Sequence, residues 1–238
     1  MAGILFIISA PSGSGKSTLV SQLRSLVEGL EFSISYTTRQ PRGSEEDGRE
    51  YHFITRGEFE RIKAAGGFLE WAEVFGNYYG TAVAALAHAK HAGKDLLLDI
   101  DVQGAMQIMQ KLPEAVSIFI MPPTPEVLER RLRNRSEAEH MTSEDVIGRR
   151  LREAQKELDR LREYKYAIVN DDLDVAVSEM KAIVLTERVA PEADVALAES
   201  CLTSAGSSRL VNALKSFKAA EDAMRADKTT TDVLASPE

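Results

Sequence analysis

A short glycine-rich segment near the start of the chain carries the clearest chemical signal. It comprises Ala10, Pro11, Ser12, Gly13, Ser14, Gly15, Lys16, Ser17 and Thr18. It fits the pattern G-x-x-x-x-G-K-[ST], except that Ala10 replaces the first glycine. Gly13 and Gly15 let successive backbone N–H groups point into one concavity, which attracts phosphate. Lys16 would reach the β- and γ-phosphates of a nucleoside triphosphate, and the Ser17 hydroxyl would hold Mg²⁺.

A glycine-rich surface turn is the alternative interpretation of this segment, and its flanks weigh against it. The preceding residues Ile4–Ser9 are an apolar, β-rich run typical of a buried strand. The following stretch has one apolar helix face, formed by Leu19, Val20, Leu23 and Val27. Because a phosphate loop lies between a strand and a helix, this context favours nucleotide binding.

A second cluster of chemically useful side chains lies between residues 37 and 54. Arg39 and Arg42 are three positions apart in a loop, and Tyr51 follows nine residues later. Guanidinium groups bind phosphate oxygens in a bidentate way, and a phenol can donate one more hydrogen bond. The spacing therefore predicts an anion clamp, with a solvated charged loop as the alternative.

Alternating strands and helices must position these two clusters. Leu96–Asp101 is a buried strand pattern that ends in acids, and further strands are expected at Val116–Met121 and Ala167–Val169. Amphipathic helices are expected at Glu126–Arg135 and over residues 142–161. Strands that alternate with helices imply a parallel sheet covered by helices on both faces, so we expect an α/β fold.

The bulk composition excludes several classes of protein. The chain has 238 residues and a net charge of −8, which argues against broad nucleic-acid binding because that needs a basic face. No segment approaches the roughly 20 apolar residues of a membrane span. The single cysteine, Cys201, excludes an internal disulfide and fits a reducing compartment. We therefore expect a cytoplasmic protein without nucleic-acid or membrane partners, and leave self-association open.

Several longer motifs resemble the guanylate kinase family of P-loop nucleoside-monophosphate kinases. Besides the two clusters above, the matching motifs are Phe68–Ala72, Gly76–Thr81, Asp99–Gly104 and Ile168–Asp172. They occur in the family's order, and the similarity runs from about Ile4 to Arg188. The resemblance implies Mg²⁺-dependent transfer of the ATP γ-phosphoryl group to GMP or dGMP, in purine nucleotide metabolism.

The resemblance also implies a P-loop NTPase three-layer sandwich with a parallel core sheet, a small mixed β insertion and a helical lid. The core would comprise residues 1–34, 83–125 and 164–189, the GMP-binding insertion residues 35–82, and the lid residues 126–163. After Val189 the composition shifts towards Ala, Ser, Asp and Glu. We therefore expect the extension, residues 190–238, to be poorly ordered, with one helix near Leu210–Met224.

Position by position, the resemblance assigns roles to residues of this chain. Those that match binders of the GMP phosphate are Arg39, Arg42, Tyr51 and Tyr79, and those that match readers of guanine are Ser35, Glu70 and Thr81. Asp99 and Asp101 match acids beside the acceptor and the metal, and Asn170 falls where the family places adenine. The implied catalytic set is Lys16, Arg42, Arg135 and Arg150, although Arg149 and Arg152 lie close to Arg150. The implied metal ligands are Ser17 and Asp101.

Guanine recognition by Glu70 also has an independent chemical argument. Guanine offers two adjacent donors, N1–H and the exocyclic amine, and one carboxylate accepts both. Adenine has an unprotonated N1 there, so a buried carboxylate would discriminate against it by roughly 10³-fold. Taken alone, Glu70 would be interpreted as an ordinary surface acid before a buried Trp71.

Two other functions fit part of the sequence. One is a related kinase for another acceptor such as a ribose phosphate, against which the base-reading set Ser35, Glu70 and Thr81 argues. The other is a non-catalytic, guanylate-kinase-like binding module. Such modules typically lack a working phosphate loop, whereas Gly13, Gly15 and Lys16 are present here.

Overall fold

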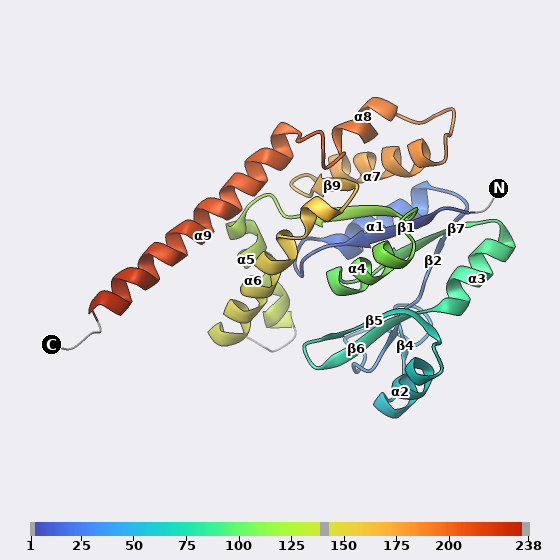
Figure 1. The fold of residues 1–238 in the computed structure, drawn as a ribbon, viewed down its shortest axis with the longest axis horizontal. Helices are drawn as coiled ribbons and strands as arrows, with labels where there is room; N and C mark the ends of the chain where they lie inside the picture. Colours follow the sequence, from blue (N-terminus) through green and yellow to red (C-terminus); the bar gives the residue numbers. More distant parts are fainter. Residues whose placement is uncertain (1–2, 139–142, 235–238) are drawn as a thin grey trace.

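A five-stranded parallel sheet forms the centre of the molecule in this computed structural model, which describes residues 3–138 and 143–234 (Figure 1). Its strands lie in the order β2-β7-β1-β8-β9. Their bounds are β1 Leu5–Ser9, β2 Leu30–Phe32, β7 Asp95–Asp99, β8 Val116–Met121 and β9 Tyr166–Val169. Strands β1, β8 and β9 are buried along their whole length, as near-continuous apolar runs are when helices cover both faces of a parallel sheet.

Helices form a layer on each face of this sheet, which confirms the predicted three-layer α/β fold. One face packs against α1 (Lys16–Leu26), α7 (Leu173–Glu187) and α8 (Val195–Ser200). The opposite face packs against α3 (Val83–Ala92), α4 (Val102–Lys111), α5 (Pro125–Ala138), α6 (Glu144–Leu158) and the start of α9 (Ser208–Leu234). Successive strand residues such as Ile7 and Ile8 join opposite layers, because side chains alternate along a strand.

The insertion has a separate four-stranded sheet in the order β4-β3-β6-β5. Its elements are β3 Tyr36–Thr37, β4 His52–Phe53, α2 Arg56–Ala64, β5 Phe68–Val74 and β6 Asn77–Ala82. The sheet is mixed, since β3 pairs parallel with β4 but antiparallel with β6. Phe59 of α2 stacks on Phe68 and Tyr78 with ring centroids 4.4 and 5.1 Å apart. The insertion therefore has a small apolar core of its own.

The extension is where the structure differs most from the sequence-based expectation. Helices α8 and α9 follow α7, so the described part of the extension is folded. Before the extension, a short 3₁₀ helix (Leu161–Glu163) precedes β9. Leu210, Ala213 and Phe217 of α9 are buried in the main core. Their spacing of three and four positions gives a narrow apolar stripe. Because the rest of the segment is polar, its overall composition gave no sign of this packing. None of the helices in the described ranges, α9 included, has the length and apolarity needed to cross a membrane.

Candidate active site

A cavity of about 480 Å³ opens at the carboxyl ends of β1 and β7, between the core sheet, the insertion and α6. The predicted site residues that line it are Ala10, Pro11, Ser12, Gly13, Ser14, Gly15, Lys16, Ser17, Thr18, Ser35, Arg42, Tyr51, Glu70, Tyr79, Asp99, Asp101 and Arg150. Three predicted residues, Arg39, Thr81 and Asn170, are not in the lining. The side chain of Arg135 lies outside the described residues. Crevices outside the carboxyl ends of parallel strands are the usual ligand sites of this fold class.

The phosphate loop has the backbone geometry that anion binding requires. Gly13 and Gly15 adopt φ values of 89° and 86°, which L side chains rarely adopt. Ala10 is not among the described residues with positive φ, so its methyl group introduces no backbone strain. Helix α1 begins directly after Gly15, and no described side chain caps it. Its first N–H groups are therefore directed at an anion together with those of the loop.

Asn170 and Arg131 support the loop from behind. The Asn170 side chain donates from Nδ2 to the Ser14 carbonyl at 2.7 Å, and a Cβ atom on Gly15 would lie closer than 3.0 Å to the same Nδ2. Arg131 donates to the Ser14 carbonyl at 3.3 Å and to the Asn170 carbonyl at 3.2 Å, and it also lines the cavity. The structure thus places Asn170 behind the loop, where it orients the backbone.

Arg131 is a site residue that the sequence interpretation missed. It lies on α5, four positions before Arg135 in the chain. Burial and the neighbouring Arg130 lower the pKa of Arg131, as expected for a cation held in a partly desolvated place. The signal that could have identified it is the arginine pair at i, i+4 in a helix predicted to belong to the lid.

Lys16 contacts the strand end that carries the acids. Its ammonium group forms an ion pair with Asp99 and donates to the Ile100 carbonyl at 2.9 Å. Burial by itself would lower the pKa of Lys16, but the Asp99 carboxylate outweighs it and the net shift is upward. The lysine is therefore held charged at the mouth of the phosphate loop, and an incoming phosphate would replace or share the Asp99 carboxylate.

Glu70 is a buried carboxyl group on β5, directly opposite Thr81 of β6. Only 2% of it is exposed, and its Oε2 atom has no hydrogen-bond partner among the described residues. Burial raises the pKa of Glu70 to about 7, and hydrogen bonding with Thr81 offsets part of that effect. Because an unpaired polar atom in the interior is costly, the Oε2 atom is available to a partner that the protein itself does not supply.

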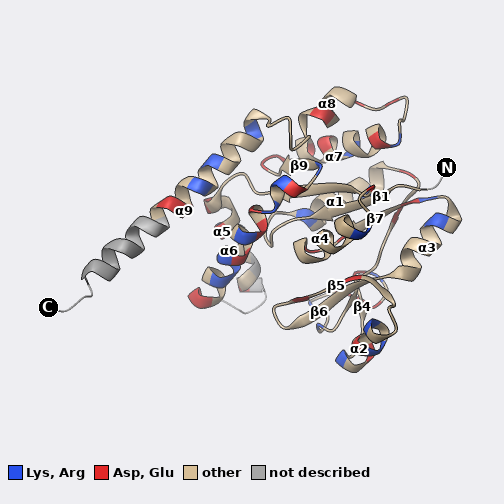
Figure 2. Ribbon diagram, viewed as in Figure 1, with Lys and Arg blue, Asp and Glu red and all other residues tan. Residues whose placement is uncertain are grey.

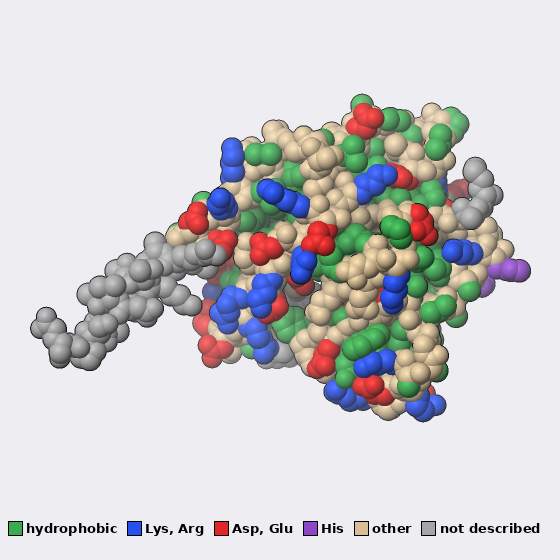
Figure 3. Space-filling model, in the orientation of Figure 1, with side chains coloured by type: hydrophobic (Ala, Val, Ile, Leu, Met, Phe, Trp, Pro, Cys, Tyr) green, Lys and Arg blue, Asp and Glu red, His purple; other side chains and the backbone are tan. Residues whose placement is uncertain are grey.

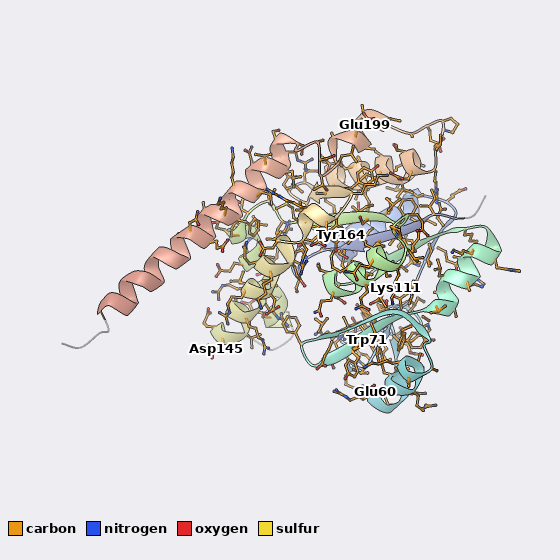
Figure 4. All side chains as sticks on the ribbon, viewed as in Figure 1. Glu60, Trp71, Lys111, Asp145, Tyr164 and Glu199 are labelled. Carbon is orange, nitrogen blue, oxygen red and sulfur yellow. The ribbon has the colours of Figure 1, made fainter. Side chains whose placement is uncertain are left out.

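Helix α4 makes room for the Glu70 carboxylate. It packs along β5, as the positions of Lys111 on α4 and Trp71 on β5 show (Figure 4). Gly104 faces Glu70, and a Cβ atom there would lie closer than 3.0 Å to Oε2. The sequence interpretation placed Gly104 in a matching motif but assigned it no role. Only the packing of α4 on β5 reveals that its missing side chain is required.

The predicted anion clamp is divided between two kinds of residue. Arg42, Tyr51 and Tyr79 line the cavity. Arg39 instead makes a bidentate ion pair with Glu45, at 2.8 and 3.0 Å, and donates from Nε to the Tyr79 hydroxyl at 3.2 Å. Glu45 also accepts from the Arg42 backbone N–H at 2.8 Å. Arg39 and Glu45, the latter missed from sequence, therefore shape the loop that presents Arg42 and Tyr79.

Asp101 has a structural role besides the one predicted. Its Oδ1 atom accepts from the N–H groups of Gln103 and Gly104 at 2.8 and 3.1 Å, which caps α4. Among the described residues, no group of three or more His, Cys, Asp and Glu side chains could hold a metal ion. Mg²⁺ needs no such group, because it is usually bound by one or two protein oxygens together with phosphates and waters. Ser17 and Asp101 line the same cavity and fit that donor set.

Helix α6 presents one of three candidate arginines to the cavity. Arg150 is buried, lines the cavity and donates to the Ser136 hydroxyl of α5 at 3.0 Å. Arg149 is exposed, with its guanidinium carbon 5.5 Å from the centroid of the Phe75 ring, and Arg152 is exposed as well. Figures 2 and 3 show Lys and Arg side chains gathered over α6. Although the net charge of the chain is −8, Lys and Arg side chains are thus concentrated on α6, a helix that lines the cavity.

Two acids on the same helix were not predicted. Glu153 and Glu157 of α6 line the cavity with Arg150, one and two turns further along. Burial, with a smaller effect of Asp101, raises the pKa of Glu157 to about 7. The sequence signal that could have identified these two acids is their spacing from Arg150. They follow it at i+3 and i+7, beside the apolar stripe of α6.

Comparisons with known proteins point in the same direction as this geometry. The family described as "Guanylate kinase" matches residues 3–187. A guanylate kinase of Koribacter versatilis is 52% identical over 231 residues, which cover 93% of this chain and 99% of that protein. A guanylate kinase of Vibrio parahaemolyticus is 48% identical, with 82% and 93% covered. The crystal structure of guanylate kinase from Anaplasma phagocytophilum matches with a TM-score of 0.66 and 34% identity, over 80% of this chain and 88% of that one.

Proposed function

The chain belongs to the guanylate kinase family, and on that premise we propose that its cavity transfers the γ-phosphoryl group of ATP to GMP, giving ADP and GDP. The observation that supports this acceptor best is the buried Glu70 carboxyl, whose Oε2 atom has no partner among the described residues. Guanine would supply N1–H and its amine to that carboxylate. The phosphate loop lines the same cavity, so both nucleotides can meet there.

The donor half of the site would bind the triphosphate of ATP. The N–H groups of the loop and of the first turn of α1 would surround the phosphates, and Lys16 would neutralise their charge. Asn170 would act mainly by holding the loop through its hydrogen bond to Ser14. It would also lie close to the adenine of ATP. Ser17 and Asp101 would hold Mg²⁺, which when bound would neutralise charge on the transferring phosphate.

The acceptor half would fix both ends of GMP. Arg42, Tyr51 and Tyr79 would bind its phosphate, and Arg39 would position Tyr79 through the hydrogen bond to its hydroxyl. At the other end Glu70 would read the base, assisted by the hydroxyls of Ser35 and Thr81. This arrangement would aim an oxygen of the GMP phosphate at the donor.

The transfer step would need positioning and charge neutralisation more than acid–base chemistry. An oxygen of the GMP phosphate forms a bond to the γ-phosphorus while the bond to the β–γ bridging oxygen breaks. Because the acceptor phosphate is already anionic, no strong base is required. Arg150, with Arg135 and Arg131, would neutralise charge on the transferring group from the lid. Arginines in such positions contribute about 10³–10⁵ in rate in related phosphoryl transfers.

The rival functions are less consistent with this site. A ribose phosphate has no base, so it would leave the Glu70 carboxylate buried and unpaired, which is costly. A non-catalytic module has no need for a glycine loop that points N–H groups at a lysine-lined cavity. A cytoplasmic location is also part of the proposal, and the single, buried cysteine supports it.

An acceptor panel tests the proposal directly. Release of ADP is measured by a coupled assay with the full chain, ATP and Mg²⁺, and with GMP, dGMP, AMP, UMP or ribose 1,5-bisphosphate as the acceptor. GMP and dGMP should be phosphorylated and AMP should be used about 10³-fold less efficiently. Comparable turnover of AMP or of the ribose bisphosphate, or no turnover of any acceptor, would contradict the proposal.

A further inference from the structure

The start of α9 lies against β9 (Figure 1). Strand β9 ends at Val169, and Asn170 follows it directly. The loop-supporting residue is therefore next in the chain to a strand that the extension contacts. The motifs assigned to nucleotide binding and catalysis all lie before residue 190. The contact between α9 and β9 is therefore separate from those motifs.

Arg209 makes the contact at that point. One of its guanidinium nitrogens donates to the Val169 carbonyl at 2.8 Å and to Oδ1 of Asp171 at 2.5 Å. The other terminal nitrogen contacts the carboxylate of Glu179 on α7. The planar guanidinium thus fixes the residues on both sides of Asn170 and ties them to α7, which is a geometry that a lysine cannot reproduce.

One of the carboxyl groups that Arg209 contacts is buried. Glu179 is only 6% exposed, and its burial raises its pKa while Arg209 partly offsets that effect. Removing Arg209 would leave the Glu179 carboxyl in the interior without its cation, which is strongly unfavourable. The link between α9, β9 and α7 is therefore expected to remain closed in the native state.

Asn170 connects this segment to the phosphate loop. Its backbone N–H donates to the Met121 carbonyl at 2.9 Å, and its side chain donates to the Ser14 carbonyl. The space in front of it exists only because Gly15 has no Cβ atom. A shift of Asn170 by about 1 Å would therefore either break its bond to Ser14 or press on Gly15.

The same helix also packs on the lid base that carries Arg131. Leu210 and Phe217 of α9 share one core cluster with Leu128 and Leu132 of α5. Arg131 of α5 in turn donates to both Ser14 and Asn170. The extension therefore contacts both supports of the loop, one through Arg209 and one through an apolar surface.

We propose that Arg209 is a positioning residue for the ATP half of the site. By holding Val169 and Asp171 it keeps Asn170 in place, and Asn170 keeps the phosphate loop in its binding shape. Arg209, Asn170 and Arg131 lie on α9, at the end of β9 and on α5, whereas Glu70, Arg42 and Tyr51 of the acceptor half lie on the insertion. The inference rests on the proposed function for its kinetic test, but not for its binding test.

The test compares Arg209→Ala with Leu5→Ala, a buried residue at the amino end of β1, away from the phosphate loop. Kinetics at varied ATP and GMP, calorimetric titration with ATP–Mg²⁺, and thermal unfolding are measured on full-length proteins. Arg209→Ala should raise the KM and Kd for ATP about tenfold and leave the KM for GMP within about twofold. Leu5→Ala should lower the melting temperature, since it removes buried apolar contacts, without that selective effect. Arg209→Lys should recover only part of the ATP affinity.

Several outcomes would overturn the inference. They are an equal rise in both KM values for Arg209→Ala, an unchanged Kd for ATP, or an equal rise in ATP KM for Leu5→Ala. If Arg209→Ala does not fold, Asp171→Asn removes one contact of Arg209 and should raise the Kd for ATP about threefold, and no change would count against the inference. If the wild type binds ATP but does not phosphorylate GMP, the proposed function fails while the calorimetric comparison still decides the role of Arg209.

Discussion

The donor and acceptor halves of the cavity are built on different physical principles. In the donor half, the loop presents backbone N–H groups, and its charged side chain Lys16 already has a partner in Asp99. In the acceptor half, recognition rests on side chains, and the buried Glu70 carboxyl has an oxygen without a partner among the described residues. The charged side chain of the donor half thus has a partner within the protein, whereas one Glu70 oxygen of the acceptor half has none among the described residues.

This difference teaches where specificity comes from. Backbone N–H groups and a lysine recognise phosphate, a group that all nucleoside triphosphates share. A buried carboxyl without a partner makes the wrong base costly, because that base would leave it unpaired in a dry environment. Selection of the acceptor therefore depends on a destabilising feature, whereas donor binding depends on a stabilising one.

Each half nevertheless contains a glycine whose missing side chain leaves space for a functional group. Gly15 leaves room for the Asn170 amide behind the loop, and Gly104 leaves room for the Glu70 carboxylate. Only Gly15 also needs its positive φ. A methyl group at either glycine would move a functional side chain without touching a substrate, so the two halves can be perturbed separately.

The largest effect is expected in the donor half, from Lys16→Met. Loss of the ammonium group removes charge neutralisation in the transition state, so kcat should fall about 10³-fold. The KM for GMP should stay within about twofold of wild type, because the acceptor contacts are intact. Steady-state ADP release checks both values. Lys94→Met, at an exposed lysine, is the matched control, and a loss of similar size there would refute the assignment.

The acceptor half should respond next most strongly, to Glu70→Gln. The amide presents a donor where guanine also has one, so kcat/KM for GMP should fall about 10²-fold while the KM for ATP is unchanged. Glu73→Gln on the same strand changes an exposed acid and should have no such effect. Competition between GMP and AMP measures the loss of selectivity. A Glu70→Gln enzyme that still prefers GMP as wild type does would contradict base reading by Glu70.

The pKa of Glu70 predicts a pH dependence confined to the acceptor half. Since burial raises this pKa to about 7, the carboxyl is mostly protonated at pH 6 and mostly ionised at pH 8. Only the ionised form accepts both guanine donors, so the KM for GMP should fall about tenfold from pH 6 to pH 8. The GMP phosphate titrates near pH 6 as well, so the change is measured relative to Glu70→Gln. Identical pH profiles for the two proteins would exclude Glu70 as the source.

The smallest expected effect comes from Gly104→Ala, which alters only the space around Glu70. The added Cβ atom would push the carboxylate away from its position, so the KM for GMP should rise about fivefold with kcat and the KM for ATP little changed. Gly57→Ala in α2, where an added Cβ atom meets nothing within 4 Å, is the matched control. A rise in the KM for ATP alone would show that α4 serves the donor half instead.

Features set by short stretches of chain were predictable from sequence. Strand β1, the phosphate loop and α1 follow one another within a single local pattern, because the φ values of Gly13 and Gly15 and the start of α1 are requirements of adjacent residues. Four of the five core strands were predictable for the same reason, since they are continuous apolar runs. Strand β2, Leu30–Phe32, was not, because it is a three-residue, half-buried strand at the edge of the sheet. The folded extension was not, because its composition is polar and its described core residues, Ala198, Cys201, Leu210, Ala213 and Phe217, are few and widely spaced.

What the sequence by itself determined is therefore the fold class, the family and the chemical types available for the site. Which of these groups meet depended on packing between elements far apart in the chain. Packing presents Arg150 to the cavity rather than Arg149, turns Arg39 towards Glu45, and isolates the Glu70 carboxyl beneath Gly104. A side chain's type specifies what it can bind, but its burial and its partners decide whether it binds the protein or a ligand. Those two quantities exist only in the folded structure.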